Sequence, residues 1–176
     1  MPGGGHYSLL SIPYRFTRSF YGLQAFALLL AVLATGLLVR HAWVQGGPAL
    51  GVFYAAALCF NPYFVFMSSN FWNPHLLLLF LALIFLARSA LAQGRDSPLL
   101  LFALLPLAAI CAQLHFITLF IVPPALLLYL LLFYRGRNWK WFWLGLAGAA
   151  ALFLPYLIEE IQHGFTNTRA MQLMTG

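Results

Sequence analysis

The residues best suited to chemistry in this sequence stand in short polar interruptions between long apolar runs. One interruption is Gln113-Leu114-His115, and another runs from Trp72 to His75 and includes Asn73. Imidazole nitrogens bind metals or hydrogen-bond to phosphates, and side-chain amides donate hydrogen bonds to anionic oxygens. These residue types predict either a polar binding surface or helix breaks whose side chains satisfy freed backbone groups.

Few charged groups are available to complete such a surface. Glu159 and Glu160 are adjacent, and neighbouring helical residues do not face the same way, so each is a separate candidate base or a solvated residue at a helix end. Arg15 and Arg18 can hold a phosphate or extend to lipid head groups. The one candidate metal ligand is His115, and a single imidazole does not make a metal site.

The apolar runs themselves indicate a membrane protein. Of the 176 residues, 63% are hydrophobic and 7% are charged, whereas roughly a quarter of the residues in an ordinary soluble domain are charged. The net charge of +6 comes from basic residues scattered singly between apolar runs. This pattern argues against a nucleic-acid-binding face and is typical of topology signals.

The runs predict an all-α fold, a polytopic transmembrane bundle of about six membrane segments in one domain spanning residues 1–176. A hydrocarbon core of about 30 Å needs about 20 helical residues, so the charge-free stretch 98–134 must break, and its only polar interruption is Gln113 to His115. Residues 1–19 form an arm, residues 20–158 the helical core and residues 159–176 a tail. The predicted segments are 20–39 ending at Arg40, 49–67 with Asn61-Pro62 in its middle, 75–87 ending at Arg88, 98–112, 116–134 and 139–158.

Basic residues predict which side of these segments is cytoplasmic. If six segments alternate, the basic residues divide six to three: Arg40, Arg88, Arg95, Arg135, Arg137 and Lys140 on one side, and Arg15, Arg18 and Arg169 on the other. The first side is therefore expected in the cytoplasm. The arm, the Trp72 to His75 turn, the Gln113 to His115 turn and the tail are expected on the outer face.

Four stretches, in this order and spacing, resemble a known family: PGGGHYSLLSIP, NPYFVFMSSNFWNPHLL, QLHF and LPYLIEEIQHGFTN. From about Pro2 to about Thr168 the chain resembles the membrane core of bacterial GT-C-type glycosyltransferases, the branch of the protein O-mannosyltransferases and the lipid A aminoarabinose transferase. The resemblance implies an inner-membrane enzyme that transfers a sugar from a polyprenyl-phosphate carrier on the periplasmic face. It implies a carboxylate base, with a divalent cation or basic side chains at the leaving phosphate. The candidate carrier-binding residues are Trp72, Asn73, His75, Gln113, His115, Arg15 and Arg18.

The sequence departs from this family in its acidic residues. Those enzymes carry catalytic carboxylates in a large first periplasmic loop, whereas no Asp or Glu precedes Asp96 here. We therefore expect a truncated membrane core that is inactive alone, with Glu159 and Glu160 as the catalytic candidates. No cofactor is evident, and a divalent cation is implied by the resemblance only. The alternative is a non-catalytic accessory or scaffold subunit. Expected partners are the lipid bilayer, the carrier-linked sugar if the protein is active, and other membrane subunits, but no nucleic acid.

Overall fold

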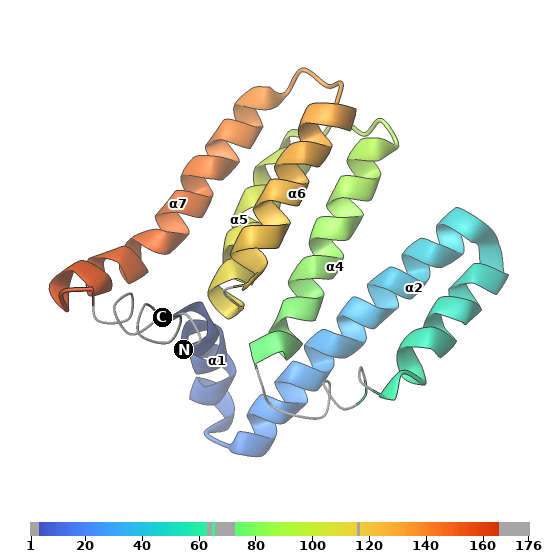
Figure 1. Ribbon diagram of the computed structural model, residues 1–176. Coiled ribbons are helices and arrows are strands. Elements are labelled where there is room, and N and C mark those ends of the chain that lie inside the picture. The colour runs from blue at the N-terminus through green and yellow to red at the C-terminus, as the bar shows by residue number, and fades with distance from the viewer. Residues whose placement is uncertain (1–3, 63–64, 66–72, 116, 166–176) are drawn as a thin grey trace, which may run out of the picture.

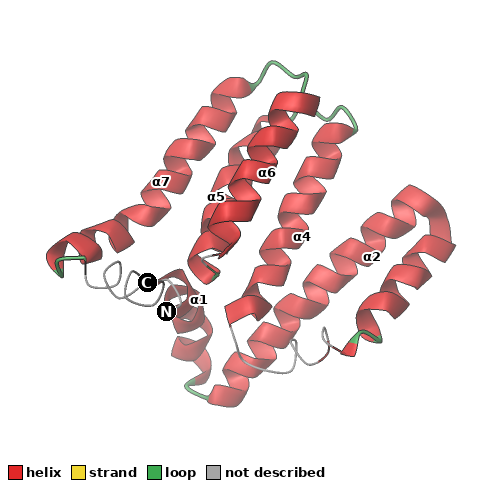
Figure 2. Ribbon diagram, viewed as in Figure 1, coloured by secondary structure: helices red, strands yellow, loops and turns green. Residues whose placement is uncertain are grey.

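The computed structural model describes residues 4–62, 65, 73–115 and 117–165, and within these ranges the chain is all-helical (Figures 1 and 2). This confirms the predicted all-α class. The helices of the described part are α1 (Gly4–Thr17), α2 (Phe20–Cys59), α4 (Asn73–Ala92), α5 (Pro98–Leu114), α6 (Ile117–Phe133) and α7 (Trp139–Gln162).

Helix α2 is two legs folded back on each other, not one straight helix (Figure 1). The reversal occurs at Gly47, where φ is 79° and ψ is −177°, followed by Pro48. Glycine adopts positive φ without steric cost, and proline lacks a backbone donor, so this pair breaks a helix. The predicted end at Arg40 is wrong, because one long charged side chain does not disturb helical backbone geometry.

The second leg is shorter than the sequence analysis expected. It ends at Cys59 with Phe60 as its C-cap, before the Asn61-Pro62 pair that was predicted to lie in mid-segment. A residue that precedes proline is disfavoured in the helical region, which explains why the chain leaves the helix here. Residues 63–64 and 66–72, which include Trp72, lie outside the described residues.

Both ends of the chain contain more helix than expected. The predicted arm is helix α1, and α7 continues to Gln162, so Glu159 and Glu160 belong to a helix and not to the tail. No proline or glycine interrupts residues 156–163, and the chain turns at Gly164, whose φ is 64°. Lacking an earlier breaker, the helix runs past the predicted boundary at Ile158.

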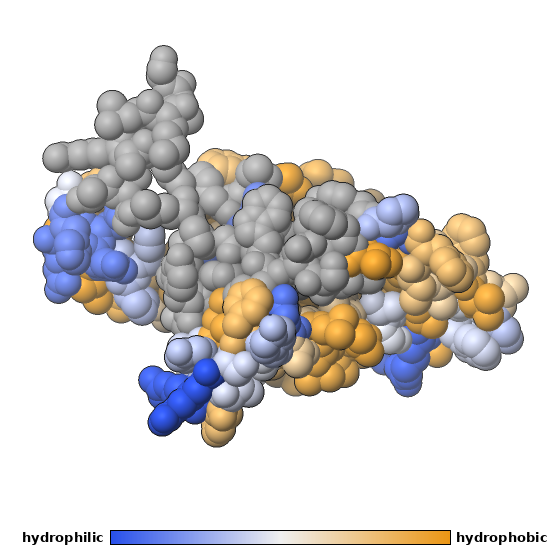
Figure 3. Space-filling model, turned by 90° about the horizontal axis from the view of Figure 1, so that it is seen from below, coloured by the Kyte–Doolittle hydropathy of each residue, from blue (hydrophilic) through white to orange (hydrophobic). Residues whose placement is uncertain are grey.

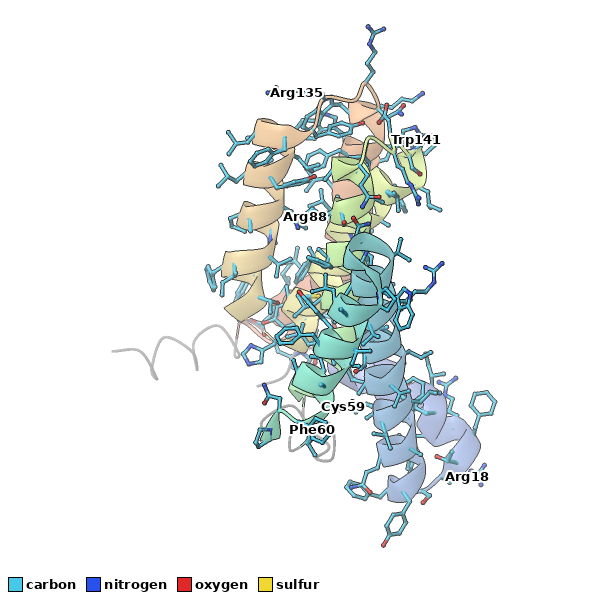
Figure 4. The ribbon with its side chains drawn as sticks, turned by 90° about the vertical axis from the view of Figure 1, so that its right-hand side faces the viewer. Arg18, Cys59, Phe60, Arg88, Arg135 and Trp141 are labelled. Atoms are coloured by element: carbon cyan, nitrogen blue, oxygen red, sulfur yellow. The ribbon has the colours of Figure 1, made fainter. Side chains whose placement is uncertain are left out.

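The helical passes run alternately between two ends of the molecule (Figure 1). The basic end holds the turn at Gly47 and the loops 93–97 and 134–138. The α1 end holds α1, the turn after α5 and the last residues of α7. Figure 4 shows Arg135 and Trp141 at the basic end and Arg18 at the α1 end.

Helix α5 lies at the centre of the bundle, with α4, α6 and α7 packed around it. Its buried side chains include Leu101, Leu104 and Leu114, which are fully excluded from solvent. The hairpin formed by α2 packs on α4 and α1 at the edge of the bundle. Small residues of α2, namely Ala27, Ala31, Ala34 and Ala42, are buried and permit a close approach.

The outside of the bundle is apolar. Val32 is 60% exposed, Leu128 59% and Leu154 53%, and these side chains lie on α2, α6 and α7. In Figure 3, which looks onto the α1 end, hydrophobic surface lies beside hydrophilic side chains. Among the described residues, α2 and α7 are long and apolar enough to cross a membrane, and residues 76–92, 98–114 and 118–133 form shorter apolar helices. Most of the apolar residues of α2 and α7 are exposed, unlike those of a core helix in a soluble protein.

A pair of glycines on α7 tests the packing of α7 on α5. A Cβ atom on Gly145 would lie 2.5 Å from the backbone oxygen of Phe102, whereas one on Gly148 would meet its nearest atom, Pro106 Cγ, at 3.5 Å. We expect Gly145→Ala to lower the midpoint of thermal unfolding in detergent by several degrees, because overpacking costs about 1–3 kcal/mol. Gly148→Ala, with the same gain in helix propensity, should leave the midpoint unchanged or higher. Equal effects of the two substitutions would contradict this account of the packing.

Candidate functional site

Gln113 contacts the backbone of α7. Its amide Nε2 donates to the backbone oxygen of Leu152 at 2.7 Å. Pro155 has no N–H, so the carbonyl that loses its helical donor is that of Ala151, the neighbour of Leu152. The Gln113 amide is used in a contact between α5 and α7, which favours the structural interpretation of Gln113 over a role in carrier binding.

His115 forms the turn between α5 and α6. Its N–H donates to the Cys111 oxygen at 2.9 Å, and its own carbonyl accepts from the Thr118 N–H at 2.9 Å and the Thr118 hydroxyl at 2.7 Å. The backbone is fixed by these three bonds, while the side chain is half-buried. The imidazole makes no hydrogen bond to any residue in the described part of the chain.

The two adjacent glutamates face different surroundings, as expected for neighbours on a helix. Glu160 is 2% exposed, whereas the Glu159 side chain is exposed. The Glu159 carbonyl accepts hydrogen bonds from the His163 N–H at 3.0 Å and from His163 Nδ1 at 2.9 Å, with the ring in the tautomer that carries hydrogen there. Glu159 is therefore the member of the pair whose carboxylate can reach a ligand.

Arg15 and Arg18 lie at the α1 end with exposed side chains (Figure 4 labels Arg18). Arg18 joins α1 to α2 and has φ 45°, a left-handed conformation that is uncommon for a residue with a side chain. Asn73 and His75 stand in the first turn of α4 at the same end, but their side chains lie outside the described residues. Arg15, Arg18, His115 and Glu159 thus belong to segments that lie at the same end of the bundle, namely α1 with its following turn, the turn after α5 and the end of α7.

Among the described residues, no group of three His, Cys, Asp or Glu side chains is close enough together to hold a metal ion. His115 therefore belongs to no such group within the described residues. The divalent cation implied by the family resemblance has no additional support from the side chains of the described ranges.

A polar network at the basic end, which the sequence analysis did not identify, joins two loops. The Tyr134 hydroxyl donates to Asp96 Oδ1, and the Arg137 N–H reaches Asp96 Oδ2 at 3.4 Å. Asn138 closes the network, since its side-chain amide donates to the Asp96 carbonyl at 3.3 Å and its N–H reaches the Tyr134 hydroxyl at 3.3 Å. Gly136 leaves no room for a Cβ beside Tyr134 and Asp96.

The two ionisable groups of this network shift in opposite directions. The hydrogen bond from Tyr134 lowers the pKa of Asp96, assisted by the bonds from Asn138 and the Arg137 backbone and opposed by partial desolvation. Burial, together with the hydrogen bond to Asp96, raises the pKa of Tyr134 to about 12. At neutral pH the pair is therefore a carboxylate that accepts from a neutral phenol, which is a structural clamp between the loops.

A groove of about 420 Å³ separates the two legs of α2, near Cys59 in Figure 4. The Thr35 hydroxyl, its main polar group, already donates to the Ala31 carbonyl at 2.9 Å. The other described residues that line the groove are apolar and carry no charged group. The lining residues are Leu28, Ala31, Val32, Thr35, Gly36, Cys59 and Val65.

The clamp makes a pH-dependent prediction for Asp96→Asn. Because the pKa of Asp96 is lower in the folded protein, its stabilisation is present above the unfolded pKa of about 3.9 and is lost as the pH falls through the folded value. We expect the substitution to lower the thermal unfolding midpoint at neutral pH. The difference from wild type should narrow toward about pH 3, measured by scanning calorimetry in detergent. Glu159→Gln, which alters an exposed carboxylate at the other end, is the control, and a pH profile for Asp96→Asn that parallels wild type would contradict the clamp.

Comparison with known proteins adds no identification. No protein-family model, curated protein or solved structure matches the chain. The functional conclusion therefore depends on the residues and their geometry.

Proposed function

We propose that this chain is an integral membrane protein whose six helical passes cross the bacterial inner membrane, with the α1 end outside and the basic end in the cytoplasm. The support is the apolar outer surface of α2, α6 and α7, which is costly in water and suited to lipid. The alternation of the passes also brings the basic residues of the loops 93–97 and 134–138 to one end, as the positive-inside rule requires.

Within this frame, the α1 end holds a polyprenyl-phosphate carrier, and the protein is glycosyltransferase-like. The observation that carries this proposal is the pair of exposed arginines, Arg15 and Arg18, at the edge of the apolar shell. No ion pair joins either guanidinium to a described carboxylate. A guanidinium near the membrane interface binds phosphate oxygens well, and apolar helix surfaces accept the prenyl chain.

Sugar transfer requires a base for the acceptor and compensation of the leaving phosphate's charge. Glu159 is the described carboxylate at this end with an exposed side chain, and the half-buried imidazole of His115 is the second candidate base. These two groups are candidates for the base, but the described residues contain no cluster of metal ligands to compensate the charge of the leaving phosphate. We therefore propose that the chain by itself binds the carrier and does not turn it over.

A second candidate function is a non-catalytic accessory subunit. It is favoured by the use of Gln113 in a backbone contact with α7, and by the exposed apolar side chains of the second α2 leg, Val52 and Phe53. On this hypothesis the α2 hairpin contacts another membrane subunit, and the α1 end binds no carrier.

Carrier binding by the purified protein distinguishes the two functions. We expect the wild-type protein to bind a polyprenyl phosphate saturably, as measured by native mass spectrometry. The affinity should fall about tenfold or more in Arg15→Ala/Arg18→Ala, since charge-assisted hydrogen bonds contribute about 1.5–3 kcal/mol. Arg135→Ala, an exposed arginine at the other end, is the matched control and should bind normally.

Turnover of a polyprenyl-phosphate sugar is measured on the same preparations with and without Mn²⁺. Carrier binding without turnover supports the proposal, and absence of binding in the wild type supports the accessory subunit. Metal-dependent turnover that disappears in both His115→Ala and Glu159→Gln would show instead that this chain is a complete catalyst.

A further inference from the structure

Arg88, on α4, has no carboxylate partner among the residues that the structure describes. The sequence contains three acidic side chains. Asp96 accepts from Tyr134 and the Arg137 backbone, and Glu159 and Glu160 lie at the opposite end of α7 from Trp139 and the basic end. A half-buried arginine is costly unless an anion compensates it, so Arg88 is a candidate site for an anion that does not belong to the described residues.

Two aromatic rings hold the Arg88 guanidinium in place. Its Cζ lies 5.4 Å from the ring centre of Phe85 and 5.1 Å from that of Tyr129, both within the range of a cation–π interaction. Such contacts use the faces of the rings and are not hydrogen bonds. The guanidinium N–H groups donate no hydrogen bond to a described residue, and they are the donors that a bidentate acceptor uses.

The rings are themselves fixed by neighbouring contacts. The Tyr129 hydroxyl donates to the Arg88 carbonyl at 3.2 Å, and its ring stacks on Phe133 with centres 5.5 Å apart. Phe85 meets the imidazole of His41 edge to face at 5.4 Å, and His41 Nε2 lies 3.2 Å from the Ser89 hydroxyl. The site is thus preorganised by α2, α4 and α6 together, which lowers the entropic cost of binding.

The position of Arg88 fits a membrane interface. It lies four residues before the end of α4 at Ala92, about 6 Å along the helix. Helices α4 and α6 each pack on α5 and not closely on one another, and Figure 4 shows Arg88 in the space between helices below the level of Arg135. Trp141, whose ring contacts Lys140 at 5.7 Å, lies at the same end, as expected for an interfacial aromatic residue.

We propose that Arg88, held by Phe85 and Tyr129, binds the phosphate of an anionic phospholipid from the leaflet at the basic end. The surrounding cations favour a lipid with net negative charge over a zwitterionic one, since Arg95, Arg135 and Arg137 are exposed at this end. The lipid's acyl chains lie along the apolar surfaces of α4 and α6. This inference rests on the membrane placement and is independent of the carrier site at the α1 end.

Native mass spectrometry of protein exchanged into mixed phosphatidylglycerol and phosphatidylcholine nanodiscs tests the site. We expect one retained phosphatidylglycerol, and a loss of about tenfold or more in its affinity on Arg88→Ala. Arg95→Ala, which removes an exposed cation at the same end, should change the affinity by less than about twofold. Equal losses in Arg88→Ala and Arg95→Ala would overturn the proposal in favour of diffuse surface charge.

Variants of Tyr129 keep the proposal testable if Arg88→Ala does not fold. Tyr129→Phe retains the ring and should bind the lipid nearly as well as wild type, whereas Tyr129→Leu should weaken binding several-fold. Unchanged lipid affinity in both variants would contradict the role of the Tyr129 ring in holding Arg88. Inorganic phosphate is the competitor: no displacement supports a lipid ligand, and displacement at millimolar concentration would identify a site for free phosphate instead. Arg15→Ala/Arg18→Ala should retain phosphatidylglycerol whether or not it binds the carrier.

Discussion

The apolar outer surface of the bundle is the constraint on which the rest of this structure depends, because such a surface is stable only in an apolar environment. The side chains that point away from the bundle on α2, α6 and α7 are mainly leucine, valine and phenylalanine. The centre of the bundle is also apolar, because α5 buries leucine and alanine on its inner surface. Because both surfaces are apolar, the hydrophobic effect does not determine which face of each helix points inward. Close packing at small residues, such as Gly145 against Phe102, determines it instead.

Polar groups under this constraint gather at the two ends, and the two ends differ. At the basic end, Asp96, Tyr134 and Asn138 satisfy one another and tie together two loops about 40 residues apart in the sequence. At the α1 end, Arg15, Arg18 and the imidazole of His115 remain without described partners. A clamp gives rigidity to the first end, whereas the open groups of the second end are those that a phosphate-headed ligand needs.

Local sequence signals predicted the helical class and the breaks between the later helices. The polar Gln113 to His115 interruption falls where the structure turns, because polar residues and helix breakers act locally. The end predicted at Arg88 is wrong, since α4 continues through this residue to Ala92. The end at Arg40 was mispredicted because a charge was given more weight than the conformational signal at Gly47 and Pro48.

Contacts between distant segments were beyond prediction from one sequence. The burial of Glu160, the use of the Gln113 amide on the α7 backbone and the pairing of Arg88 with the Tyr129 ring all depend on which helix faces meet. Periodicity gave little help, since helices that are apolar all round have no distinct inner stripe. Only the contacts of Asp96 had a signal in the sequence, because Asp96 is the one carboxylate among the basic residues of its end.

The most direct measurement of the central claim is cysteine accessibility in intact membranes, in a variant that lacks Cys59 and Cys111. Single cysteines replace Glu159 at the α1 end, Arg137 at the basic end and Leu128 on the outer surface of α6, all of which are exposed. The account predicts that an impermeant maleimide labels Glu159→Cys from outside, Arg137→Cys only after permeabilisation, and Leu128→Cys only after denaturation. Labelling of both ends from the same side, or of Leu128→Cys in the intact membrane, would contradict it.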